Sequence, residues 1–224
     1  KKKGSDKENS EAKKSDGETR RYVNVEDLLD ARLAGSSRSK ECSLFITEGK
    51  SAARLAASMC PKDKYGVLPI RGKFVNAGKK SKGEFNKNKE VQSLKVALGL
   101  KQNSKDPSTL RYGKVIIFTD QDSDGYHIRM LLITMFSTYW PELFKRGYLW
   151  MFETPIVKAT KPGKPLVNLY DQQKVEEHIK ANSGYKYKYY KGLGTSTDAE
   201  AKEYFDNRDQ LMWKIVGDIN QIKK

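Results

Sequence analysis

Four acidic side chains stand out in this sequence because they lie in two short motifs that could bind a metal ion. They are Glu48, Asp120, Asp122 and Asp124. The first belongs to the run Thr-Glu-Gly-Lys-Ser-Ala, and the other three alternate in Asp-Gln-Asp-Ser-Asp-Gly. Clustered carboxylates repel one another unless a cation or a shared proton compensates, and hard divalent cations prefer oxygen ligands. If the two motifs meet in space, they predict a Mg²⁺ site suited to phosphoryl transfer.

Each motif follows a short apolar run that is typical of a buried strand. The wider pattern predicts strands alternating with helices, which indicates an α/β fold with a Rossmann-like parallel sheet flanked by helices. The expected strands and β-rich stretches are 43–47, 65–70, 115–119, 148–157 and 185–190, and the expected helices are 23–34, 51–59, 91–100, 127–139 and 198–205. Ligands of such sheets bind at the carboxyl ends of the strands. Neighbouring strands would therefore bring the four carboxylates together.

Other interpretations of the Asp-x-Asp-x-Asp-Gly run can be compared by spacing. An EF-hand calcium loop needs a bidentate Glu at its twelfth position, which here is Leu131, and a helix where this chain predicts a strand. A phosphoaspartyl hydrolase also places Asp-x-Asp after a buried strand. That family normally has Thr or Val at the position of Asp124 and gives no role to Glu48. A loop whose aspartates bond their own backbone is the plainest alternative.

The chain is strongly basic, with 43 Lys and Arg, 28 Asp and Glu and a formal net charge of +15. Such an excess favours a polyanionic partner, and nucleic acid is the first candidate. Residues 61–115 hold fourteen basic and four acidic residues, so we expect a nucleic-acid contact there. Residues 1–21 contain a single apolar residue, Ala12, and predict a disordered linker, with a localisation signal or a DNA-binding arm as the alternative.

Several classes of protein are excluded by what the sequence lacks. It has no apolar run of eighteen residues, so we expect no membrane span, and its first residues do not form a secretory signal. Its two cysteines, Cys42 and Cys60, are too few for a disulfide framework or a Cys-based zinc site, which favours a reducing, intracellular compartment. No glycine-rich phosphate loop is present, so we expect no ATP site in this chain. The first residue is Lys, which suggests a piece of a longer protein.

Four sequence blocks, in this order, carry a family resemblance. They are Thr-Glu-Gly-Lys-Ser-Ala (47–52), Pro-Ile-Arg-Gly-Lys-Phe-Val-Asn (69–76), Thr-Asp-Gln-Asp-Ser-Asp-Gly-Tyr-His-Ile (119–128) and Tyr-Tyr-Lys-Gly-Leu-Gly-Thr-Ser (189–196). Together they resemble the toprim domain of topoisomerases, primases and related nucleases, and most closely that of type IIA DNA topoisomerases of the eukaryotic kind. The resemblance covers roughly residues 25–206.

The resemblance implies roles for particular residues. Glu48, Asp120 and Asp122 match the family's metal-binding acids, and Asp124 matches a third aspartate that lies beside or binds a second metal. In this family a tyrosine attacks a DNA phosphodiester, and Glu48 would serve as general acid or base for the leaving 3′ oxygen. The residues that would contact DNA are Arg71, Lys73, Asn76, His127, Lys191, Gly192 and Gly194. For His127, a helix-start residue without a chemical role is an equal alternative.

The resemblance also implies a larger enzyme, an ATP-dependent topoisomerase II that makes and reseals double-strand breaks for DNA strand passage. Its ATPase region would precede this chain, and its winged-helix region with the nucleophilic tyrosine would follow, so we expect the chain to be inactive alone. The parent would be a homodimer acting on double-stranded DNA in the nucleus, with an organellar or viral source as the alternative. The expected parts are a disordered basic linker (1–21), a connecting helix (22–40), the toprim core (41–160) and a β-rich C-terminal extension with the Lys-Gly-Leu-Gly loop and a helix (161–224).

One residue departs from the family pattern. The family usually has Asp where this chain has Lys50, which places a base beside the expected metal site. We expect altered metal affinity, an altered response to drugs that trap the cleaved complex, or both. Two further functions stay open at this point. The chain could be a stand-alone toprim nuclease or primase-like protein, or a non-catalytic basic DNA-binding module whose carboxylates are structural.

Overall fold

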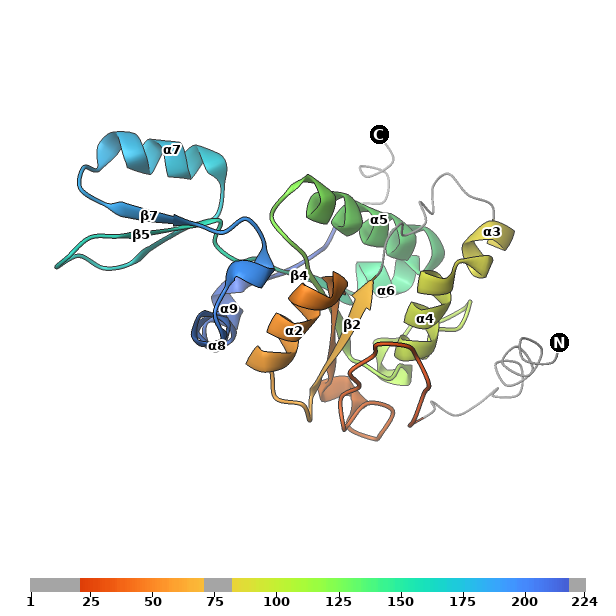
Figure 1. The fold of residues 1–224 in the computed structure, drawn as a ribbon. Helices are drawn as coiled ribbons and strands as arrows, with labels where there is room; N and C mark the ends of the chain where they lie inside the picture. Colours follow the sequence, from red (N-terminus) through yellow and green to blue (C-terminus); the bar gives the residue numbers. More distant parts are fainter. Residues whose placement is uncertain (1–20, 71–81, 218–224) are drawn as a thin grey trace, which may run out of the picture.

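A five-stranded sheet forms the centre of the computed structural model, which describes residues 21–70 and 82–217 (Figure 1). Its strand order is β2-β1-β3-β4-β8. The strands are β1 (Ser43–Glu48), β2 (Tyr65–Ile70), β3 (Lys114–Phe118), β4 (Leu149–Phe152) and β8 (Met212–Lys214). The first four run parallel, and β8 pairs with β4 in the antiparallel direction. The predicted α/β fold with a mostly parallel sheet is confirmed.

Helices cover both faces of this sheet because successive residues of a strand point to opposite sides. Leu44 and Ile46 of β1 pack with the helices of one face, whereas Phe45 packs with those of the other. The helices of the first face are α4 (Lys89–Leu98), α5 (Ser123–Tyr139) and α6 (Pro141–Lys145), and α3 (Lys82–Lys87) adjoins them. Those of the second face are α2 (Gly49–Met59), α8 (Asp198–Asp206) and α9 (Arg208–Leu211). Burial on both sides explains the continuous apolar runs of β1 and β3.

A second, smaller layer projects beyond α8 in Figure 1, and we call it the arm. It is an antiparallel sheet in the order β6-β5-β7, covered on one face by α7. Its elements are β5 (Val157–Thr160), β6 (Val167–Leu169), α7 (Gln172–Ala181) and β7 (Lys186–Tyr189). Its small core contains Val157, Ala159 and Val175. Thus β5, from the range expected for the core, belongs to the arm, while β8, from the range expected for the extension, belongs to the main sheet.

The predicted helix over residues 23–34, within the expected connecting helix 22–40, is wrong. The described segment consists of irregular backbone and turns, with an isolated bridge at Leu29 and the short 3₁₀ helix η1 (Ser39–Glu41) at its end, and Asp27 has a φ of 61°, which lies outside the range of a right-handed α-helix. Leu29 instead pairs with Val67, each amide donating to the other's carbonyl at 2.9 and 2.8 Å. Because β2 is an edge strand, it offers unpaired backbone groups to the segment. This tertiary pairing overrides the helical spacing of the apolar residues.

The same segment is held by a buried arginine. The Arg111 side chain is fully buried, forms an ion pair with Asp30, and donates to the backbone oxygens of Ala97 at 2.7 Å and Arg21 at 3.0 Å. A buried charge is tolerated when it is paired and hydrogen-bonded in this way. The approach to β1 is therefore an irregular segment anchored to the sheet and to α4.

The remaining predicted helices lie close to their expected positions, with the main differences at their first residues. The helix expected from residue 127 begins at Ser123, because Asp122 caps it. The helix expected from residue 91 begins at Lys89 after a cap by Asn88. In the described ranges, no helix has the length and apolar character needed to cross a bilayer. The expected disorder of residues 1–21 falls almost entirely outside the described residues, and so does part of the basic stretch 61–115, residues 71–81.

Candidate functional site

The two acidic motifs meet because their strands are neighbours. β1 pairs with β3 so that Thr47 lies opposite Phe118, and both motifs follow directly at the carboxyl ends. From β1 the chain passes by α2 to β2 on one side, while β3 lies on the other side. The strand order therefore changes direction between β1 and β3. Such a switch point is where open α/β sheets bind their ligands.

Glu48 ends β1 and has an uncompensated carboxyl group. Its Oε2 atom is buried and has no hydrogen-bond partner in the part of the chain that the structure describes. Burial raises the pKa of Glu48, and the charges of Asp120, Asp122 and Asp124 raise this pKa further. Although Glu48 precedes α2, its side chain makes no capping hydrogen bond. A carboxyl oxygen left in this way is available to a ligand that carries positive charge or a proton.

Asp120 is held by a backbone amide from a distant part of the chain. The Leu193 N–H donates to Asp120 Oδ1 at 2.7 Å. Burial raises the pKa of Asp120, the hydrogen bond from Leu193 opposes this effect, and the charge of Asp122 adds to it. A Cβ atom at Gly192 would lie 2.7 Å from Asp120 Oδ2, closer than any side chain allows. Gly192 therefore permits the loop to approach the carboxylate.

Asp122 and Asp124 lie at the start of α5. Asp122 caps this helix, its Oδ1 accepting from the Gly125 N–H at 2.8 Å, and Asp124 lies in the first turn. Both are exposed, so their free oxygens face solvent. Negative side chains are stabilised at a helix N-terminus by its dipole. The helix thus offsets part of the repulsion among the carboxylates.

Arg129 is a part of the site that the sequence did not predict. Its guanidinium donates to the Asp120 carbonyl oxygen and to Gln121 Oε1, both at 3.1 Å, and to the Gly125 carbonyl oxygen at 3.3 Å. Burial lowers the pKa of Arg129, while the charges of Glu153 and Asp122 oppose this. The sequence holds no clear signal for this role, because two of these three acceptors are backbone carbonyl oxygens. Arg129 fixes the turn that carries the aspartates.

The donor set suits a metal held by few protein ligands. No group of three or more His, Cys, Asp or Glu side chains in the described ranges is arranged to hold a metal ion. Asp120 and Asp122 each give one oxygen to a backbone amide, which leaves their second oxygens and the buried Glu48 Oε2. Mg²⁺ usually takes one or two carboxylates and completes its octahedral shell with waters and phosphate oxygens. These residues fit such a site.

The structure describes some of the other expected site residues and not the rest. Lys191, Gly192 and Gly194 belong to the loop around the short 3₁₀ turn η3 (Leu193–Thr195), which contacts Asp120 and α2. His127 is exposed on α5, two residues after Gly125. Arg71, Lys73 and Asn76, expected to contact DNA, lie outside the described residues.

Lys50 forms an ion pair with the approach segment. Its Nζ lies 3.5 Å from Asp27 Oδ1, and its side chain is 70% exposed. An exposed pair of this kind contributes at most about 1 kcal/mol to stability. The charge of Lys50 is therefore partly balanced by Asp27, in the segment that leads to β1.

Comparisons with known proteins agree with this geometry. The Toprim domain model matches residues 43–154, and the C-terminal associated domain of TOPRIM matches residues 152–221. The chain is 46% identical to DNA topoisomerase 2 of Arabidopsis thaliana, over 97% of the chain and 16% of that protein. It is 44% identical to the mitochondrial DNA topoisomerase 2 of Dictyostelium discoideum (86% and 16%) and 42% identical to human DNA topoisomerase 2-beta (86% and 13%).

A solved structure shows the same similarity at the level of the fold. The DNA-binding, cleavage and re-ligation domain of Plasmodium falciparum topoisomerase II matches with a TM-score of 0.79 and 41% identity. The match covers 86% of this chain and 28% of that chain. The chain spans 13–16% of the length of the curated relatives named above. It is thus similar in sequence and in fold to one segment of much larger proteins.

Proposed function

This chain belongs to the toprim domain family, in the form carried by type II DNA topoisomerases, and from that premise we propose that it is the Mg²⁺-binding segment of an ATP-dependent DNA topoisomerase II. The parent enzyme makes and reseals double-strand breaks to pass one DNA duplex through another. The observation that carries this proposal is the meeting of Glu48 with the aspartate motif at the switch point of the sheet. Its ATPase and its nucleophilic tyrosine lie outside this chain.

The residues of the site have different proposed roles, in metal binding, in proton transfer and in positioning the aspartates. Toprim domains of topoisomerases use a divalent metal, and carboxylates from the set Glu48, Asp120, Asp122 and Asp124 would hold it here, one or two of them directly. When bound there, Mg²⁺ would supply stabilisation of the negative charge that develops on the scissile phosphate and on the leaving 3′ oxygen. Glu48 would exchange a proton with that oxygen, as its general acid or base. Leu193 and Arg129 keep the aspartate turn in place.

DNA is the substrate to which the positive charge is suited. We assign phosphate contacts to Arg71, Lys73 and Lys191, with Asn76, His127, Gly192 and Gly194 close to the cleaved strand. Binding of this type weakens steeply as salt rises, because neutralised phosphates release counterions. The parent acts as a homodimer in the nucleus; an organellar enzyme is the alternative, since one relative is mitochondrial.

The chain alone is expected to bind DNA without sequence preference and Mg²⁺ weakly, and to neither relax nor cleave supercoiled plasmid. The reason is that none of the twelve tyrosines of this sequence lies in residues that resemble the surroundings of the family's nucleophilic tyrosine. Agarose gel assays with the isolated chain, with and without Mg²⁺, test this. Metal-dependent nicking without a covalent protein–DNA link would favour the stand-alone nuclease, and relaxation by the chain alone would contradict the proposal.

The parent enzyme provides the complementary test. Chelation of divalent metal by EDTA is expected to abolish DNA cleavage, and added Mg²⁺ to restore it. If the carboxylates were structural in a non-catalytic DNA-binding module, Asp122→Asn in the parent would leave strand passage intact. Under the proposed function the same substitution lowers cleavage and raises the Mg²⁺ concentration that cleavage requires.

Replacing Lys50 by Asp is expected to lower the Mg²⁺ concentration for half-maximal cleavage about two- to tenfold, because two units of charge change beside Glu48 and are partly screened. The measurement is a Mg²⁺ titration of the parent enzyme's cleavage, repeated with a drug that traps cleaved complexes. Lys62→Asp, the same charge change beyond the far end of α2, is the control. Unchanged metal dependence and drug trapping in Lys50→Asp would show that the departure at this position has no consequence.

A further inference from the structure

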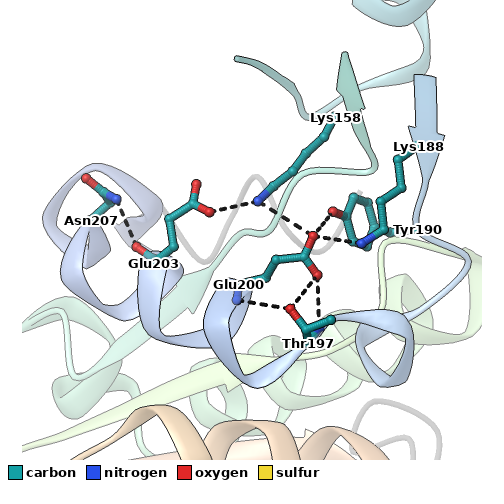
Figure 2. A network of polar contacts seen from close by, with 7 residues as sticks. All are labelled: Lys158, Lys188, Tyr190, Thr197, Glu200, Glu203 and Asn207. Atoms are coloured by element: carbon teal, nitrogen blue, oxygen red, sulfur yellow. Dashed lines mark hydrogen bonds and ion pairs between the residues drawn. The ribbon is translucent and has the colours of Figure 1, made fainter. Parts of the chain in front are cut away.

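The loop over residues 190–197 is tied at both ends by one carboxylate, that of Glu200 (Figure 2). At the start of the loop, the Tyr190 hydroxyl donates to Glu200 Oε1. At its end, the Thr197 N–H and hydroxyl donate to Oε2 at 2.9 and 3.1 Å. The Glu200 N–H donates back to the Thr197 hydroxyl at 3.3 Å, which completes a capping box at the start of α8. Each oxygen of one side chain thus holds a different end of the loop.

Glu200 is charged and held firmly in this position. Its side chain is 15% exposed, and the Lys188 Nζ donates to Oε1 at 2.8 Å. Although burial opposes ionisation, the hydrogen bonds from Lys188, Thr197 and Tyr190 lower the pKa of Glu200 to about 2. The buried Lys158 Nζ lies 3.9 Å from Oε1 and donates to Glu203 at 2.9 Å. Figure 2 shows these cations converging from β5 and β7 on the two glutamates of α8.

Between its two tied ends, the loop contacts the candidate metal site. Leu193 is buried among the side chains around α2, and its N–H is the donor to Asp120 Oδ1 at 2.7 Å. Gly192 passes so close to the Asp120 carboxylate that a Cβ would collide with it. The orientation of Asp120 therefore depends on where the loop places the Leu193 amide.

We propose that Glu200 is a positioning residue for Asp120, because it fixes both ends of the loop that holds this metal-binding aspartate. The inference rests on the proposed function, and it assigns Glu200 no contact with metal or DNA. Fixing the two ends removes loop conformations in which the Leu193 amide would leave Asp120. Residues that orient a metal ligand typically cost about 10–100-fold in metal affinity or activity when they are removed.

The test compares Glu200→Ala, Glu200→Gln and the control Glu203→Ala in the full-length parent enzyme. Glu203 lies on the same helix and binds the same buried Lys158, but within the part of the chain that the structure describes no hydrogen bond or ion pair joins it to the loop. Two quantities are measured, the Mg²⁺ concentration for half-maximal cleavage and, without metal, the hydrogen exchange rate of the peptide over residues 190–197. The thermal unfolding midpoint is recorded for each variant.

Glu200→Ala is expected to raise the half-maximal Mg²⁺ concentration about tenfold or more and to accelerate exchange in the loop by a similar factor. Glu200→Gln keeps one acceptor oxygen, so it holds one end of the loop and gives an intermediate result. Glu203→Ala lowers the unfolding midpoint yet leaves both quantities near wild type. If Glu200→Ala does not fold, Glu200→Gln and Thr197→Ala provide the same two measurements.

Wild-type exchange and wild-type Mg²⁺ dependence in the Glu200 variants would overturn the inference, as would an equal effect of Glu203→Ala. Failure of the proposed function has a different signature, since cleavage would then not depend on Mg²⁺ or on Glu48 in any variant. The exchange measurement needs no metal and no DNA, so it decides the loop's dependence on Glu200 in either case.

Discussion

Replacing Glu48 by Gln in the full-length parent enzyme is expected to lower the rate of DNA cleavage by about 10²–10³-fold, the usual effect of removing a major electrostatic stabiliser. Gln has nearly the same shape, so the sheet is retained. It has no negative charge for a metal and no basic oxygen for the 3′ hydroxyl proton. The buried Glu48 Oε2 lacks a protein partner among the described residues. In the Gln variant its place would be taken by the amide nitrogen or by the uncharged amide oxygen.

The measurement is single-turnover formation of the covalent protein–DNA complex, followed by religation after the metal is chelated. Glu41→Gln serves as the matched control because Glu41 lies at the opposite end of β1 and pairs with Arg38 and Lys64 on the surface. The control is expected to cleave at the wild-type rate. A Glu48→Gln enzyme as fast as the control would remove the chemical basis of the proposed function.

Gly125→Ala is expected to be the second most damaging change, although it adds one methyl group. A Cβ at this position would fall inside contact distance of the Asp120 carbonyl oxygen and only 2.9 Å from its carbonyl carbon. The start of α5 and the Asp120 backbone would have to move apart. A displacement of about 1 Å at a reacting site can cost about 10²-fold in rate, and overpacking costs about 1–3 kcal/mol of stability.

Two assays separate these effects for Gly125→Ala, the cleavage rate at saturating Mg²⁺ and the free energy of unfolding. Gly163→Ala is the control, since Gly163 has a φ of +74° but no atom within 4 Å of a built Cβ. It is expected to lose about 1–2 kcal/mol from backbone strain and to cleave normally. Normal cleavage by Gly125→Ala would mean that the turn after β3 adapts without moving Asp120.

The acids of the site were predictable because their signals are local. Glu48 and the aspartate run each follow a buried strand, and apolar runs between turn residues predict such strands well. The neighbouring position of β1 and β3 cannot be derived from these signals; a parallel sheet leaves the strand order open. The family resemblance supplied that expectation, and the pairing of the two strands agrees with it.

The rest of the site depends on contacts between distant residues, which the sequence does not display. The Leu193 N–H donates to Asp120 across 73 residues of sequence. Every residue except proline has such an amide, so the residue type does not reveal which amide will bind Asp120. The turns around Leu29 mimic a helix in their apolar spacing, yet pairing with Val67 decides their conformation. The helix α7 was not predicted because its sequence is polar and Val175 is its one buried residue, so it shows no apolar periodicity.

The pairing of β4 with β8 has a consequence for how this chain could change in evolution. Phe152 lies opposite Met212, so the chain leaves the strands of the main sheet and rejoins them at one place, and between these points it forms the arm and then α8 and α9, which pack on the second face of the sheet. Insertions whose ends lie close together can be lengthened or exchanged without disturbing the host domain. The family model for the associated domain begins at this same residue, 152. We therefore expect the arm to tolerate changes of length better than the main sheet does, provided that the 190–197 loop still delivers one amide to Asp120.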